Sequence, residues 1–376
     1  MQISVRIAQA EEEETIVRLA NSFMSNDAHV LRQTYKAFKN EIPVENRLNV
    51  LSKIFEYSTR LQNLSDGLRT RTGVVAFLDN ERIYDWHKCA ELEAQIYRGF
   101  TDRQDKLRAN VLFLIWRSYA YSQDRLRPLM LVYLGDQSDG IRADALRSMN
   151  GFTDFDRIFT YYIHQHEGDK AYASSMAGAK KFREKHEEYQ IATIAADSKL
   201  LSEFSDSLSQ DDALKRREAQ KKFDEKVPGE GRLITLSRIW VVSEHAVNRA
   251  KIRVGVLRYL KEQKLLNWHK CMELECDIYG GFSAPEDIVR QAVFDLICVS
   301  FSQSEESLRP LLLIFLNDPN DELRASALEK FAKLQNDDKV LDLYLREHEA
   351  DAKYAKSIAS AKNILDVSRK QKATEK

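Results

Sequence analysis

The chain has 376 residues, a length that allows two or three domains or one long array of repeats. Only 13 Gly and 6 Pro are present, too few turn residues for a β-sandwich or barrel, and no glycine-rich phosphate loop of the Rossmann or P-loop type occurs. The 57 Lys and Arg nearly balance the 58 Asp and Glu, so the net charge of −1 implies no overall attraction to nucleic acid or an anionic membrane.

Apolar residues recur with helical spacing nearly throughout, which predicts an all-α protein with about ten helices in each half of the chain. In the first half we expect them at residues 8–24, 28–40, 45–61, 68–78, 84–98, 105–121, 125–134, 139–150, 153–166 and 169–186. The second half is expected to repeat this series.

An internal repeat is the strongest feature of the sequence. The segment Trp86–Phe100 recurs as Trp268–Phe282, with eleven of fifteen positions identical at an offset of 182. Pro43 matches Pro228 at an offset of 185, so a three-residue difference lies between the two matches. The pattern indicates two tandem homologous halves.

The halves run over residues 1–182 and 183–376. Their boundary falls in the charged stretch 180–188, which contains no Gly or Pro and therefore predicts a continuous helical connection.

Within each half, an Asp is followed six residues later by Arg and then by a helical apolar pattern, as in Asp136 with Arg142 and Asp318 with Arg324. This motif resembles the HEAT-repeat α-solenoids, most specifically over 100–166 and 282–348. The resemblance implies stacked helical hairpins that form a curved surface. We expect the Arg to bond turn acceptors of the adjoining repeat, and these four residues to be structural.

Four cysteines are present and none forms a Cys-x-x-Cys pair, which favours reduced thiols and a cytoplasmic or nuclear protein. The first twenty residues lack the apolar region of a signal peptide. The longest apolar run, Leu311–Leu316, is too short to cross a bilayer, so no membrane partner is expected.

The repeated Trp-His-Lys-Cys segment offers potential metal ligands in His87, Cys89, Glu91 and Glu93. On one continuous helix, His87 and Glu91 would share a face, but His87 and Cys89 would not. Core packing around Trp86, and around its counterpart Trp268, is the favoured interpretation. A partner-binding surface is the alternative that stays open, and no metal or cofactor is expected.

Two His-Glu pairs at matching positions, His166-Glu167 and His348-Glu349, resemble those of HEAT-like di-iron hydroxylases. That family pattern requires two pairs in each half. A second pair, His186-Glu187, occurs in the first half only. A hydroxylase is therefore the least favoured of the functions considered.

One surface differs between the halves. Residues 98–128 carry seven bases and three acids, whereas residues 280–310 carry two bases and five acids. Interleaved Arg and aromatic residues suit RNA or acidic protein segments. The candidate binding residues are Arg98, Arg103, Lys106, Trp116, Arg117, Tyr119, Tyr121 and Arg125.

From these patterns we expect a non-enzymatic intracellular scaffold or adaptor that binds protein partners on a curved helical-repeat surface. The alternative is an RNA- or DNA-binding protein that uses the basic window of the first half. The sequence leaves the partner's identity and the oligomeric state open.

Overall fold

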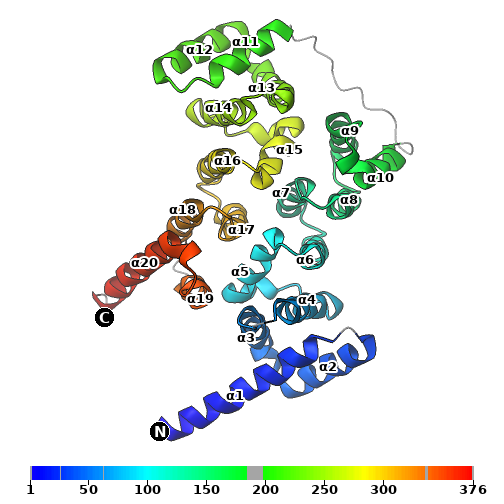
Figure 1. Ribbon diagram of the computed structural model, residues 1–376, viewed down its shortest axis with the longest axis vertical. Helices are drawn as coiled ribbons and strands as arrows, with labels where there is room; N and C mark the ends of the chain where they lie inside the picture. The colour runs from blue at the N-terminus through cyan, green and yellow to red at the C-terminus, as the bar shows by residue number, and fades with distance from the viewer. Residues whose placement is uncertain (1, 26, 62, 184–197, 335–337, 375–376) are drawn as a thin grey trace. The chain divides into compact units, whose positions relative to one another are not determined.

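The computed structural model describes residues 2–25, 27–61, 63–183, 198–334 and 338–374 (Figure 1). Over these residues the chain forms 20 α-helices joined by turns and short 3-10 segments, without a strand. None of these helices is both long and apolar enough to cross a membrane. The prediction of an all-α protein is confirmed, with ten helices described over residues 2–183 and ten over residues 198–374.

The helices agree closely with the expected segments. The first ten are α1 (Gln2–Phe23), α2 (Ala28–Glu41), α3 (Arg47–Thr59), α4 (Leu64–Asn80), α5 (Ala90–Arg98), α6 (Asp105–Ser118), α7 (Gln123–Leu134), α8 (Asp139–Ser148), α9 (Phe155–His166) and α10 (Ala173–Arg183). The expected helical connection over 180–188 lies largely outside the described residues, because the description stops at Arg183 and resumes at Ser198.

The second series follows the same order. It consists of α11 (Ser198–Leu208), α12 (Ala213–Lys226), α13 (Arg232–Val242), α14 (Arg249–Glu262), α15 (Met272–Gly280), α16 (Asp287–Ser300), α17 (Glu305–Phe315), α18 (Asp321–Phe331), α19 (Asp338–His348) and α20 (Ala355–Thr374).

The helices pack into two compact units that do not follow the order of the chain. Unit 1 combines residues 1–120 with 309–376, and unit 2 consists of residues 121–308. Each unit therefore contains the first part of one sequence half and the last part of the other. These units are defined by packing, whereas the halves are defined by sequence correspondence.

The expected helix 84–98 begins later than predicted. Trp86–Lys88 forms a 3-10 turn, Cys89 is extended, and α5 starts only at Ala90. Arg82 precedes this turn with a φ of 55°, a left-handed conformation that redirects the chain. The same turn recurs at Trp268–Lys270, preceded by Lys264 with a φ of 53°.

The two tryptophans of these turns are completely buried. The indole Nε1–H of Trp86 donates to Ser118 Oγ at 2.9 Å, and that of Trp268 donates to Ser300 Oγ at 2.8 Å. Each indole therefore contributes a large apolar surface while its polar atom is satisfied. The segment holds a core position in both units.

Helices α4 and α14 cross their neighbours at a glycine. A Cβ added to Gly73 would lie 2.5 Å from the carbonyl oxygen of Phe23 on α1. At Gly255 it would lie 2.4 Å from the carbonyl oxygen of Leu208 on α11. Both crossings require a residue without a side chain, because these distances are far below van der Waals contact.

Buried arginines stabilise the turns of the predicted repeats through hydrogen bonds to carbonyl oxygens. Arg142 donates to the carbonyl oxygen of Asp136 in its own turn and to that of Ala171 in the next hairpin. Arg324 bonds the carbonyl oxygens of Asp318 and Lys353 in the same way. The expectation that this Arg reaches the adjoining repeat agrees with these hydrogen bonds.

Candidate binding surface

Most cations of the predicted basic window are engaged with acidic residues. Arg98 forms an ion pair with Glu347 and a 3.0 Å contact with Nε2 of His348. Arg117 pairs with Asp79 at 2.7 Å. Arg125 likewise pairs with Glu306, so the expectation that these three arginines are free is wrong.

Arg103 and Lys106 remain exposed, and within the described part of the chain they have no acidic partner. They lie in unit 1, on the turn before α6 and in its first turn. Two isolated cations supply little energy for binding a polyanion, compared with the five unpaired cations that the sequence suggested.

The aromatic residues of the window have three different environments. Tyr119 is buried, and its hydroxyl lies 3.2 Å from that of Tyr97. Trp116 is half-buried, whereas Tyr121 is fully exposed. Tyr121 and Arg125 belong to unit 2, whereas the other six predicted residues belong to unit 1. The predicted set is therefore divided between the two units.

The histidines of the His-Glu pairs are held in aromatic stacks. The ring of His166 lies 3.7 Å from that of Tyr172, nearly parallel to it, and Arg142 lies 4.0 Å from the same tyrosine ring. Burial, together with the nearby guanidinium, lowers the pKa of His166 to about 4. This imidazole is neutral at physiological pH and serves as a packing element.

The second half repeats this stack with His348 on Tyr354, at 4.0 Å, and Arg324 over the tyrosine. Burial, with Arg98 and Arg324 adding to it, lowers the pKa of His348 to about 3. The remaining pair, His186-Glu187, lies outside the described residues. Across the described ranges, no three His, Cys, Asp or Glu side chains are grouped to hold a metal ion.

The Trp-His-Lys-Cys segment also differs from a ligand site. Because α5 begins only at Ala90, His87 and Glu91 do not lie on one continuous helix and do not share a helical face. Burial raises the pKa of the Cys89 thiol. In the second copy of the segment, burial raises the pKa of Cys271 to about 12. Both cysteines are therefore protonated and weakly nucleophilic at neutral pH.

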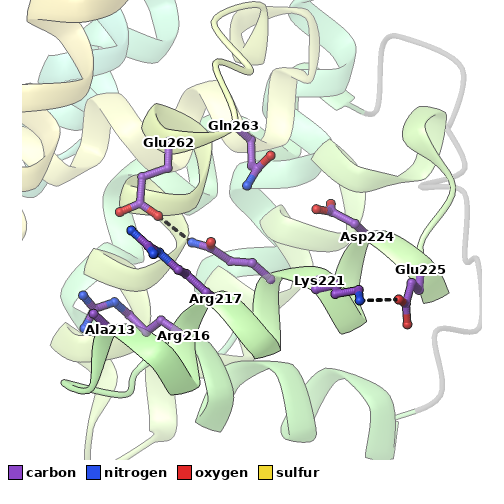
Figure 2. A pocket seen from close by; sticks show the side chains of 9 residues that line it. Ala213, Arg216, Arg217, Lys221, Asp224, Glu225, Glu262 and Gln263 are labelled. Atoms are coloured by element: carbon purple, nitrogen blue, oxygen red, sulfur yellow. Dashed lines mark hydrogen bonds and ion pairs between the residues drawn. The ribbon is translucent and has the colours of Figure 1, made fainter.

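An open cleft of about 800 Å³ lies in unit 2, between α12 and the last residues of α14 (Figure 2). Its size falls in the range of ligand and peptide sites. The side chains that line it are Ala213, Arg216, Arg217, Gln220, Lys221, Asp224, Glu225, Glu262 and Gln263.

The acidic residues of this cleft already have partners. Asp224 accepts a hydrogen bond from the Tyr259 hydroxyl and pairs with Arg232 at 3.3 Å. Glu262 Oε2 accepts a hydrogen bond of 2.6 Å from Gln220 Nε2, drawn in Figure 2. The charge of Asp224 is therefore partly compensated by Arg232, and Glu262 has a neutral hydrogen-bond partner.

The cations of α12 outnumber its acids by six to three. Arg217, which lines the cleft, is exposed, as are Lys215 and Lys222 on the same helix. These three side chains have no acidic partner among the residues that the structure describes. Lys221 lies 4.0 Å from Glu225 across one exposed helical turn, a weak pair. An uncompensated basic surface therefore borders the cleft.

The corresponding helix of unit 1 is less basic. At an offset of 185, α2 has Val30 where α12 has Lys215, and Ala37 where α12 has Lys222. Arg217 and Lys221 have counterparts in Arg32 and Lys36, so the two helices differ in basic charge at positions 215 and 222. The run Lys215-Arg-Arg-Glu-Ala-Gln-Lys-Lys222 is a local charge signal in the sequence, but it lies outside the windows 98–128 and 280–310 in which the two halves were compared for charge.

No protein-family model matches this chain, and no curated protein matches it. The fold itself defines the class, an all-helical protein whose helices pack against their neighbours.

Proposed function

We propose that this is a non-enzymatic binding protein, a helical-repeat scaffold whose α12–α14 cleft in unit 2 holds an acidic segment of a partner protein. The observation that carries this proposal is the contrast within the cleft: its acids already have hydrogen-bond or ion-pair partners, whereas Arg217 is exposed and has no acidic partner among the described residues. An incoming carboxylate would pair with this guanidinium without breaking an existing ion pair.

A peptide fits the cleft better than a nucleic acid. A peptide can place single carboxylates beside Arg217 and away from Asp224, Glu225 and Glu262, whereas a continuous row of phosphates would meet those acids and be repelled. Leu214 is 69% exposed and stands three residues before Arg217, so the two share a helical face. The expected ligand is a peptide that alternates acidic residues with an apolar anchor.

The same proposal includes a HEAT-like solenoid built from two duplicated halves. It is supported by the hydrogen bonds of Arg142 and Arg324, which are 182 positions apart and bond equivalent acceptors. The buried Trp86 and Trp268 and their serine partners support it in the same way. The four free thiols favour a reducing compartment, such as the cytoplasm or the nucleus.

The test is a binding titration with a fluorescein-labelled peptide that carries one Glu and one Leu in every three or four positions, with neutral residues between them. Reversing Arg217→Glu and Lys221→Glu together should weaken binding at least about tenfold, because two attractive pairs become repulsive. The matched control reverses Arg32→Glu and Lys36→Glu, the corresponding residues of α2, and should leave the affinity unchanged.

A labelled single-stranded oligouridylate provides the competing outcome. If it binds and the acidic peptide does not, with affinity falling about 10³-fold or more between about 50 and 200 mM salt, the protein is a nucleic-acid binder instead. Equal peptide binding by the parent protein and the α12 variant would rule out the cleft.

A further inference from the structure

Each compact unit joins segments from opposite halves of the sequence. We call residues 1–120 and 198–308 the front segments, and residues 121–183 and 309–374 the back segments. In unit 1 the front segment of the first half packs on the back segment of the second, and in unit 2 the reverse holds. We call these contacts the first and the second junction.

One buried ion pair occurs in both junctions. In the first, Arg309 Nε donates to Glu93 Oε2 at 2.7 Å. In the second, Arg127 Nε donates to Glu275 Oε2 at 2.8 Å. Arg127 and Arg309 are 182 positions apart, and so are Glu93 and Glu275. The same contact is therefore made twice, each time between a front and a back segment from different halves.

These ion pairs are well shielded from water. The glutamate side chains are only 8% and 5% exposed, and the arginine side chains 17% and 18%. Leaving either carboxylate without its arginine would strand a charge in a largely dry position, which is far more costly than loss of a surface pair. In each junction, the buried ion pair therefore links the front segment specifically to the back segment.

Further contacts in the first junction surround the pair. Helix α5 packs against α19, where Arg98 bonds Glu347 and His348. The side-chain amide of Asn317 donates to the carbonyl oxygen of Arg98 at 3.3 Å.

The second junction uses different chemistry at the matching helices. Helix α15 packs against α7 and α9, where the Tyr161 hydroxyl donates to Asp277 at 2.7 Å. A Cβ added to Gly135, the counterpart of Asn317, would lie 3.0 Å from the carbonyl oxygen of Gly280. Both junctions contain the same Arg–Glu ion pair, but the contacts around that pair differ between them.

We propose that α5 and α15 are docking surfaces, each fitted to the back segment of the opposite half, and that the two halves hold each other noncovalently through both junctions. The occupant of each surface is a segment of this chain. The peptide connection between residues 183 and 198 is then unnecessary for keeping the halves together once the chain has folded.

The experiment places a protease recognition sequence in that connection within the full-length chain. After cleavage, the two fragments are analysed by size-exclusion chromatography and by light scattering. We expect them to elute together at the mass of the uncut chain, and to stay together on dilution. Separation of the unmodified fragments would overturn the proposal.

The double variant Arg127→Glu, Arg309→Glu tests the role of the two buried ion pairs. Each reversal places two carboxylates against each other across a buried contact, so the cut fragments should bind each other roughly 100-fold or more weakly and separate on dilution. The control Arg117→Glu removes an exposed pair with Asp79 inside one front segment, and should leave the fragments associated. Unchanged association of the double variant would contradict the assigned role.

A charge exchange keeps the test informative if the double variant folds poorly. Adding Glu93→Arg and Glu275→Arg to it restores opposite charges at both positions, and should restore co-elution. Circular dichroism of each uncut variant reports folding separately from association. Failure of the exchange to restore association in a folded variant would count against specific pairing.

Discussion

The hydroxyl of Tyr161 on α9 donates a 2.7 Å hydrogen bond to the carboxylate of Asp277 on α15. Ser237 on α13 donates to the other carboxylate oxygen at 3.2 Å. Burial raises the pKa of Asp277 to about 7, although both hydrogen bonds and Arg253 act against the rise. The corresponding residue of the first half is Gln95, which has no charge and bonds Ser52.

This carboxyl makes unfolding stability depend on pH. In the unfolded chain the aspartate ionises near its ordinary pKa of 3.8, whereas in the folded protein it keeps its proton to about pH 7. The folded state therefore binds more protons between these values, and stability falls as pH rises through that window. The loss amounts to at most about 4 kcal/mol and is complete above pH 7.

Asp277→Asn should remove this dependence while keeping the hydrogen bond from Tyr161. Urea denaturation near pH 5 and pH 8 measures it, and the difference between the two values should be smaller in the variant by roughly 2 kcal/mol or more. Parallel stability profiles for the variant and the parent would refute the assignment. Asp211→Asn, a fully exposed residue paired with Lys251, provides the comparison.

The buried indoles provide a second prediction. Trp86→Phe should lower the unfolding free energy by about 2–3 kcal/mol, because it loses the bond to Ser118 and leaves a small cavity. Trp268→Phe should cost a similar amount. Trp116→Phe, at a half-buried position, should cost distinctly less in the same thermal or urea melts.

Three glycine substitutions should separate close packing from helix propensity. Gly73→Ala and Gly255→Ala force a methyl group against a carbonyl oxygen and should destabilise the protein by about 1–3 kcal/mol. Gly178→Ala lies in α10 with nothing within 4 Å of the new methyl group, and should stabilise it by up to about 1 kcal/mol. Equal effects at all three positions would argue against the crossings described above.

The buried turn arginines require their guanidinium shape. Arg142→Lys keeps the charge, but a single ammonium cannot reach both the carbonyl oxygen of Asp136 in its own turn and that of Ala171 in the next hairpin. We expect a loss of about 2–3 kcal/mol in unfolding free energy. Arg147→Lys on the same helix, where the side chain is exposed, should change stability by less than about 0.5 kcal/mol.

The sequence predicted the helices well, because apolar spacing and capping residues are local signals. Asp27 and Asp212, for example, accept backbone hydrogen bonds at the starts of α2 and α12. The turn at Trp86 was missed, because Arg82 adopts a left-handed conformation that its own side chain does not favour. Packing of the buried indole overrides the local preference.

The candidate site was predicted less well. Arg98 was expected to be free, yet its partners Glu347 and His348 lie about 250 positions away in the chain. Composition and periodicity contain no information on such distant pairs. The basic α12 was detectable as a local charge run. Only the structure shows that the acids around it have hydrogen-bond or ion-pair partners, while Arg217 has no acidic partner among the described residues.

The first and last helices, α1 and α20, both belong to unit 1, whereas unit 2 is an internal stretch of the chain. A mechanical load applied between α1 and α20 would therefore be borne first by unit 1, where Arg309 and Glu93 link the two segments that contain these helices. Unit 2, which contains the basic cleft, would remain unloaded until that contact broke. Because unit 2 is an internal stretch of the chain, the cleft within it would be protected from tension.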